Sequence, residues 1–223
     1  MNIKLLIKIV LLSGMFLQVT CLSAQDNNTP FTAGGDFYSS YVWRGVSFSG
    51  PSIQPYVDFS TGGLSIGAWG SYGFDGFQES DLYVSYGFDF GLSLGLTDYY
   101  YPGTPYFNYS ADQNGAHGFE ANVGYDIADF SFAANYMLNQ AGLAGTEGGE
   151  MYFELGYAFR DVNIFLGAGD GWHSADGTFA LVNLGLSTNR EITINDNFSL
   201  PVNGSVVLNP DLEQFHTVIG FSF

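Results

Sequence analysis

The stretch DLYVSYGFDF, residues 81–90, alternates apolar side chains with small or polar ones. Its apolar positions are Leu82, Val84, Tyr86 and Phe88. Successive side chains of a β-strand point to opposite faces, so a period of two predicts a strand with one apolar face. Residues 81–90 therefore predict a β-strand with one face in apolar surroundings and the other in polar surroundings.

The same alternation recurs along the chain, and no long helical stripe or run of 18 apolar residues interrupts it between residues 25 and 223. We predict an all-β fold, a transmembrane antiparallel up-and-down barrel of about twelve strands, with ten or fourteen as alternatives. The predicted strands are 34–44, 52–60, 63–72, 80–88, 90–99, 117–127, 130–139, 149–159, 162–170, 177–188, 198–208 and 214–223.

The connections between these segments alternate in length. Links after the second, fourth, sixth and eighth strands are tight, whereas those after the first, third, fifth, seventh and ninth are longer, the longest spanning 100–116. Short turns at one end and long loops at the other are typical of outer-membrane barrels, with the short turns in the periplasm. The tenth connection, 187–196, reads as a long loop and breaks this pattern.

The N-terminus predicts a secretory signal peptide over residues 1–24, which leaves 25–223 as one barrel domain. Lys4 and Lys8 precede a short apolar run over 9–16, and Ala24 ends a stretch suited to cleavage. This run is too short to span a bilayer as a helix. A buried helix and a lipid-modified Cys21 are the alternatives for this segment.

Charge and cysteine content narrow the possible partners. Residues 25–223 contain three arginines and no lysine against 22 acidic residues, a net charge of −19. Such acidity argues against nucleic acid as a partner, because phosphate binding relies on lysine and arginine. The segment also lacks cysteine, so packing and hydrogen bonds must hold the fold without disulfides.

The polar phase of the strands distinguishes a membrane barrel from a soluble sandwich. A soluble protein would place many lysines and glutamates there, but this chain has mainly Gly, Ser, Asn and Tyr. We therefore expect the apolar phase to face lipid and the other phase to face a hydrated interior. Aromatic residues near strand ends are expected at the membrane interfaces: Trp43, Trp69, Tyr72, Tyr99, Tyr100, Tyr101, Tyr157, Phe159 and Trp172.

The chain ends in FHTVIGFSF, residues 215–223, with aromatic and apolar side chains in one phase. This segment resembles the C-terminal strand of bacterial outer-membrane barrels, which the barrel-assembly machinery recognises. The resemblance implies that machinery as a partner, recognised through the strand that ends at Phe223, and outer-membrane lipid as the surroundings.

A second resemblance covers the first third of the chain most strongly. The segment 37–71, with Trp43-Arg44-Gly45-Val46-Ser47 and Gly67-Ala68-Trp69-Gly70-Ser71, and the later Tyr101-Pro102 turn resemble the TorF family of outer-membrane proteins, regarded as porins. Phe48 departs from the polar residue common there. The resemblance implies a location in the bacterial outer membrane and a channel role, and it supplies no catalytic residues.

Arg44 is predicted to point into the barrel, while Tyr41 and Trp43 in the opposite phase meet lipid. The other predicted pore-lining residues are Asp58, Asp81, Glu120, Asp126 and Glu154 on interior phases, with Arg160 at the turn end. Two interpretations stay open. The charges form a constriction that selects solutes, or they form a buried ion-pair network that fills a plugged barrel.

Catalysis has little support in the sequence. The segment GDGWHSADG, 169–177, places His173 beside Ser174 and two aspartates, the residue types of a serine hydrolase. Adjacent residues of an extended chain point apart, so His173 and Ser174 would hardly meet. The same segment lacks the spaced ligands of a calcium loop. We predict no enzyme activity, no metal and no cofactor.

The sequence thus favours a porin-like channel of the bacterial outer membrane for passive diffusion of small hydrophilic solutes, with a preference for cations. The alternative is a closed barrel that acts as a structural or adhesive surface protein without transport. A soluble secreted sandwich is a third possibility. The oligomeric state is left open.

Overall fold

The computed structural model describes residues 30–196 and 198–223. The predicted signal peptide, residues 1–24, lies outside this range. The strands are β1 Phe31–Tyr38, β2 Tyr41–Trp43, β3 Val46–Ser49, β4 Ser52–Thr61, β5 Leu64–Gly73, β6 Gln78–Gly87, β7 Leu92–Tyr100, β8 His117–Ile127, β9 Phe130–Met137, β10 Met151–Phe159, β11 Val162–Gly169, β12 Ala180–Asn195, β13 Phe198–Asn209 and β14 Gln214–Ser222. A 3-10 turn, η2, spans Gly171–His173.

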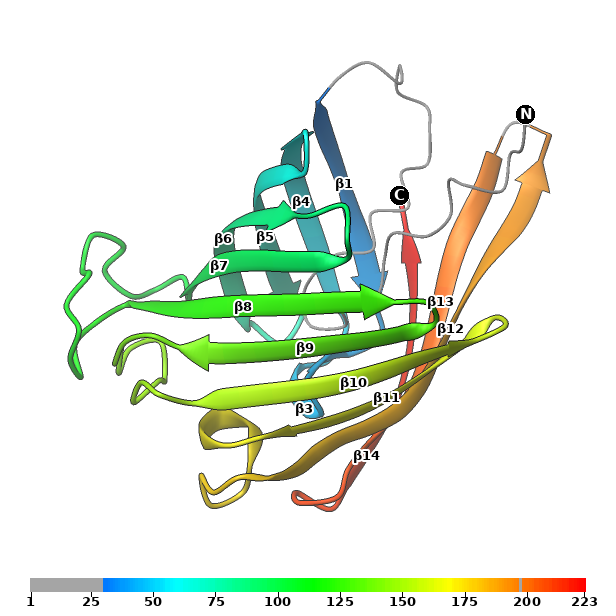
Figure 1. Ribbon diagram of the computed structural model, residues 1–223. Helices are drawn as coiled ribbons and strands as arrows, with labels where there is room; N and C mark the ends of the chain where they lie inside the picture. Colours follow the sequence, from blue (N-terminus) through cyan, green and yellow to red (C-terminus); the bar gives the residue numbers. More distant parts are fainter. Residues whose placement is uncertain (1–29, 197) are drawn as a thin grey trace.

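Twelve of these strands form a closed antiparallel barrel, which confirms the predicted fold and strand number (Figure 1). Each wall strand from β4 to β14 pairs with the next, and β1 closes the ring between β14 and β4. The β1–β14 seam is short: Asp36 lies opposite Ser222 and Tyr38 opposite Gly220. Backbone bonds in both directions between Gly35 and Phe223, each 3.0 Å, extend this seam to the last residue.

The predicted first strand, 34–44, is wrong as one continuous element. Strand β1 ends at Tyr38, and β2 and β3 form a separate two-stranded hairpin. Ser39 ends the pairing with β14, because its N–H donates to the Ile219 carbonyl and its hydroxyl accepts the Ile219 N–H. Arg44 and Gly45 then reverse the chain with φ of 49° and 84°, the left-handed pair that a two-residue hairpin turn needs.

The tenth connection is also corrected. Residues 187–195 belong to strand β12 rather than to a loop, and Asn195 pairs with Phe198 of β13. Strands β12 and β13 run past their neighbours as a ribbon at the upper right of Figure 1. In this ribbon the neighbouring residues Glu191 and Ile192 are both exposed. Charged and apolar side chains therefore do not alternate between two faces, and the sequence pattern does not indicate a strand. Short turns therefore follow every second wall strand.

The two faces of the wall are as predicted. Val84, Leu94 and Val123 point outward with 38%, 44% and 36% of their surfaces exposed. The inward phase is polar and hydrogen-bonded: Asn122 accepts from the Thr97 hydroxyl and donates to Asn135, both at 2.9 Å. The barrel is thus apolar outside and polar inside, the reverse of a soluble protein. No helix in the described residues is long and apolar enough to cross a bilayer.

The predicted interfacial positions of several aromatic residues are wrong. Trp43, Trp69 and Tyr99 are buried inside the barrel, whereas Tyr72 and Phe159 are exposed on its outer surface. The three buried rings lie on the inward phase or on the hairpin, where they pack against one another. Their position near strand ends was therefore compatible with either side of the wall.

Candidate functional site

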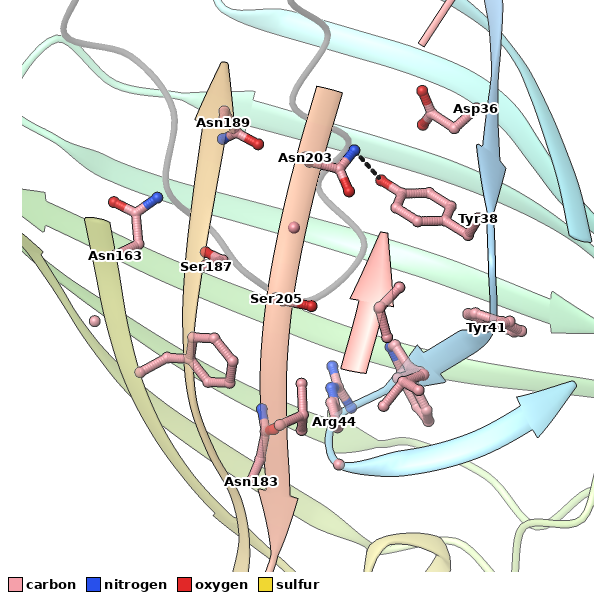
Figure 2. Close-up of a pocket in the computed structure, with 18 of the residues that line it drawn as sticks. Asp36, Tyr38, Tyr41, Arg44, Asn163, Asn183, Ser187, Asn189, Asn203 and Ser205 are labelled. Carbon is pink, nitrogen blue, oxygen red and sulfur yellow. Dashed lines mark hydrogen bonds between the residues drawn. The ribbon is translucent and has the colours of Figure 1, made fainter. Parts of the chain in front are cut away.

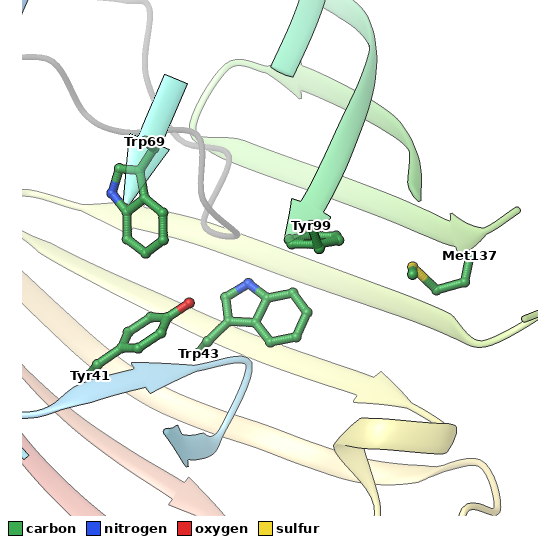
Figure 3. Packing of buried hydrophobic residues seen from close by; sticks show 5 residues of the cluster. All are labelled: Tyr41, Trp43, Trp69, Tyr99 and Met137. Carbon is green, nitrogen blue, oxygen red and sulfur yellow. The ribbon is translucent and has the colours of Figure 1, made fainter. Parts of the chain in front are cut away.

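The β2–β3 hairpin folds into the barrel and carries an aromatic cluster across its lumen. Figure 3 shows Tyr41 and Trp43 of the hairpin facing Trp69 of β5 and Tyr99 of β7. The ring centroids of Tyr41 and Trp69 are 5.6 Å apart, as are those of Trp43 and Tyr99. These spacings fall in the favourable range for aromatic pairs. Tyr41 and Trp43 thus face the interior, contrary to the prediction that they meet lipid.

Arg44 lies at the tip of this hairpin and reaches the opposite wall. Its guanidinium donates two hydrogen bonds to the Glu120 carboxylate, at 2.7 and 2.9 Å. The guanidinium also lies 4.3 Å from the centroid of Trp43 and 4.5 Å from that of Tyr152. Only 4% of Arg44 is exposed. A planar guanidinium suits this combination of a bidentate carboxylate and flanking rings.

Further hydrogen bonds fix the acceptor of this ion pair. The Glu120 carboxylate also accepts from the Tyr99 hydroxyl at 3.0 Å and from the Asn122 amide at 2.7 Å. The carboxylate thus accepts four hydrogen bonds in all, and such additional bonds help a buried ion pair to persist. The geometry supports the buried network as the interpretation of Arg44 and Glu120.

The hairpin tip is also held through its backbone. The Asn209 amide of β13 donates to the Gly45 carbonyl at 3.3 Å. A Cβ at position 45 would lie 1.9 Å from the Val182 carbonyl oxygen of β12. Gly45 is therefore required both for its positive φ and for this close approach.

A second buried carboxylate lies beside the first network. Glu154 of β10 accepts hydrogen bonds from the Tyr152 hydroxyl and from the Asn183 amide, the latter at 2.9 Å. Asn183 also donates to the Tyr152 hydroxyl at 2.9 Å. Tyr152 in turn stacks on Arg44, so Glu154 is connected to the hairpin through one ring. Sequence reasoning missed Tyr152, Asn183 and Tyr99, whose signal was a polar or aromatic residue on the inward phase.

The other predicted pore-lining residues lie apart from this group except Asp81, which lies opposite Trp69 of the aromatic cluster. Asp81 is buried on the inner face of β6. Asp58 of β4 accepts from the Tyr83 hydroxyl at 3.1 Å, and Asp126 is half-buried near the turn end of β8. Arg160 is exposed in the β10–β11 turn, with its guanidinium 5.2 Å from the Phe159 centroid. The structure therefore joins Arg44 with Glu120 and brings Glu154 close.

A cavity of about 350 Å³ occupies the lumen on one side of the hairpin. Its lining combines the hairpin with the inner faces of β1, β4, β5 and β9 to β14 (Figure 2). Asparagine and serine are frequent in this lining: Ser131, Asn163, Asn183, Ser187, Asn189, Asn203, Ser205 and Ser222. We call this cavity the chamber. The amides and hydroxyls of this lining are typical of a hydrated space rather than of a dry core.

The loop that carries His173 packs against the hairpin. The His173 ring lies 5.1 Å from the centroids of both Trp43 and Tyr152. Trp172 of the same turn donates to the Glu150 carboxylate at 3.2 Å. The contacts of His173 are thus with aromatic rings of the hairpin and of β10.

Together these features define a closed twelve-stranded antiparallel barrel with an inward hairpin and a polar chamber. No protein-family model and no curated protein matches the chain. Solved structures with likeness to it include variants of the Rhodopseudomonas blastica porin; one has 14% identity and a TM-score of 0.41, over 77% of this chain and 55% of that one. Pseudomonas aeruginosa OccK9 (OpdG) has 14% identity and a TM-score of 0.35, over 89% and 64%. The chain spans less than two thirds of the length of these proteins.

Proposed function

We propose that residues 25–223 form a channel of the bacterial outer membrane through which small hydrophilic solutes diffuse passively, with a preference for cations. The observation that carries this proposal is the inverted wall, with apolar side chains outside and hydrogen-bonded polar side chains inside. Closure of the barrel also gives every wall strand a hydrogen-bonded neighbour on both sides, as a strand in a bilayer requires.

The chamber supports a transport role, because it leaves a space of about 350 Å³, lined by polar side chains, in the lumen that the wall encloses. The hairpin narrows the lumen beside it through the Arg44–Glu120 pair. Carboxylates on the inner face, including Asp36 and Glu154 at the chamber, outnumber the one arginine there. A path lined in this way favours cations.

Location and assembly are part of the same proposal. The strand β14 ends at Ser222, and Phe223 follows with most of its ring exposed. We infer that the assembly machinery recognises this end, as in the barrels that the C-terminal segment resembles. Membership of the TorF family belongs to the proposal as well, on the motif around Trp43-Arg44-Gly45.

A closed barrel without transport is the second candidate, and the packing of the hairpin tip favours it. Arg44, Gly45 and the aromatic cluster bridge the lumen with buried contacts. Such a plug would give a stable surface protein that does not conduct.

Planar-bilayer recordings decide between the two candidates. Purified protein should give discrete conductance steps. In a salt gradient, the sign of the reversal potential should be that of a cation-selective channel. A variant in which a short Gly-Ser link replaces residues 41–49 lacks the hairpin and should give larger steps. Silence from the unmodified protein, together with conductance from this variant, would establish the closed barrel.

A further inference from the structure

The chamber has one face of regularly spaced hydrogen-bonding groups. Asn163 of β11 lies opposite Ser187 of β12, and Ser187 lies opposite Ser205 of β13. These three residues therefore form a row across neighbouring strands, and all three line the chamber (Figure 2). A second pair, Asn189 and Asn203, lies opposite one another two residues along the same strands.

These groups are uncharged and both donate and accept hydrogen bonds. An amide offers a carbonyl oxygen and two N–H groups, and a hydroxyl offers one donor and two acceptor positions. A solute whose own groups do the same, such as an alcohol or a sugar, matches them in either direction. A carboxylate can only accept hydrogen bonds and an ammonium group can only donate them, so each would use only the donors or only the acceptors of these side chains.

Two of the three charged side chains that line the chamber, Arg44 and Glu154, are already paired within the protein. Both terminal nitrogens of Arg44 donate to Glu120. The Glu154 carboxylate accepts from Tyr152 and Asn183. Asp36, on the inner face of β1, adds a carboxylate that can accept from a hydroxyl. An ionic solute would therefore have to compete with bonds that the protein makes itself.

Aromatic rings close the hairpin end of the chamber. Tyr41, Trp43 and Trp69 contribute to its lining, and Tyr38 lies beside the asparagine pair, accepting from the Asn203 amide at 3.4 Å. An apolar surface next to several converging polar groups is the usual composition of a small-molecule site. The C–H faces of a sugar ring suit such aromatic walls, while its hydroxyls suit the opposite row.

From this arrangement we propose that the chamber binds a small neutral polyhydroxylated molecule of the size of a mono- or disaccharide. The volume of about 350 Å³ lies near the lower end of the range of roughly 300–1,000 Å³ for small-molecule sites. The inference deepens the proposed function, on which it rests for how the solute reaches the lumen. It assigns a neutral solute class to binding in the chamber, whereas the preference for cations concerns the passage of ions through the lumen.

Tryptophan fluorescence tests this inference, since the chain contains three tryptophans and two of them line the chamber. The full-length protein in detergent is titrated with glucose and with sucrose, and in parallel with arginine and with glutamate. Saturable emission changes with a sugar, at lower concentrations than with either amino acid, would support the proposal. The absence of a saturable change with both sugars, or tighter binding of either amino acid, would overturn it.

Two variants show whether the signal comes from the chamber. Ser205→Leu and Asn163→Leu each remove a member of the row. Each should weaken sugar binding by about tenfold or more, because the sugar loses a hydrogen bond and the larger leucine side chain takes up space in the chamber. Thr217→Leu is the matched control. Thr217 is exposed on β14, and it lies opposite Val206, the residue that follows Ser205 in β13. It should bind like the unmodified protein. Equal weakening in all three would place the sugar elsewhere and contradict the proposal.

The binding assay needs no conductance, so the two proposals fail separately. Saturable sugar binding by a protein that is silent in a bilayer would reject the channel and retain the chamber. Conductance without sugar binding would retain the channel and reject the chamber as a sugar site.

Discussion

Arg44 and Glu120 are 76 residues apart in the chain, yet their side chains make two hydrogen bonds across the lumen of the barrel. The hairpin tip is thereby tied to the wall strand β8. Each partner is almost fully buried, with 1% and 3% of the side chains exposed. Removal of one partner would leave the other charge buried and without its ion-pair partner.

Arg44→Ala should therefore destabilise the folded barrel by about 3–5 kcal/mol, the usual cost of breaking a buried pair from one side. It should also raise conductance, because the hairpin loses its anchor. The free energy of unfolding in urea and bilayer recordings measure the two effects. Arg190→Ala is the control, since the Arg190–Asp161 pair is 64% and 60% exposed and should contribute no more than about 1 kcal/mol. Equal losses in both variants would contradict the structural role of Arg44.

Gly45→Ala should displace the hairpin tip. The added methyl group would lie 1.9 Å from the Val182 carbonyl oxygen, a backbone atom that cannot move aside cheaply. Gly62→Ala is a close control, because Gly62 also has a positive φ, 55°, but no atom within 4 Å of the new Cβ. Both variants bear a left-handed strain of about 1–2 kcal/mol. A clearly lower thermal midpoint for Gly45→Ala is expected, and identical midpoints would argue against the tip packing.

Leu96→Arg should destabilise the barrel in a bilayer by about 2–4 kcal/mol, because Leu96 faces outward in the middle of β7. Phe107→Arg provides the comparison: Phe107 is 88% exposed and lies in the connection between β7 and β8. Unfolding from lipid vesicles should show a large loss for the first variant and little for the second. A soluble barrel would tolerate both.

Acid should loosen the connection between β5 and β6. The Asp75 carboxylate accepts the backbone N–H of Gly50 at 3.0 Å and that of Phe77 at 3.2 Å. These two bonds, first that of Gly50, lower the pKa of Asp75. A pKa lowered by folding stabilises the native state above the unfolded pKa of about 4, and the contribution is lost as pH falls through the folded value.

Amide hydrogen exchange at Gly50 measures this effect. Exchange relative to the Asp75→Ala variant should be slow near pH 5 and should approach that of the variant as the pH falls below the lowered pKa of Asp75. The variant itself supplies the intrinsic pH dependence of exchange. A ratio that stays constant with pH would mean that the charge of Asp75 does not hold the loop.

The sequence was sufficient to predict the wall. Alternation around residues such as Leu82 and Leu94 reflects one boundary, between an apolar exterior and a polar lumen, and that boundary sets both the strands and their faces. Turn lengths then gave the up-and-down order. The period-two signal failed at residues 187–196, where the β12–β13 ribbon extends past its neighbours and has lost the contrast between its faces.

The hairpin was not predictable from local pattern. Tyr41 and Trp43 alternate with their neighbours as they would in a wall strand, so periodicity cannot distinguish an inner strand from an outer one. What places them inside is the partner of Arg44 on β8 and the close approach of Gly45 to β12, both distant in the chain. For the same reason the sequence could identify Arg44 and Glu120 as interior residues without pairing them.

Solvent accessibility at position 94 tests the inverted wall most directly. In a Cys21→Ser background, a nitroxide spin label at Leu94→Cys is measured in lipid vesicles against molecular oxygen, which concentrates in lipid, and a water-soluble nickel chelate. An outward-facing Leu94 predicts frequent collisions with oxygen and few with nickel. Collisions mainly with nickel would contradict a barrel whose apolar side chains meet the membrane.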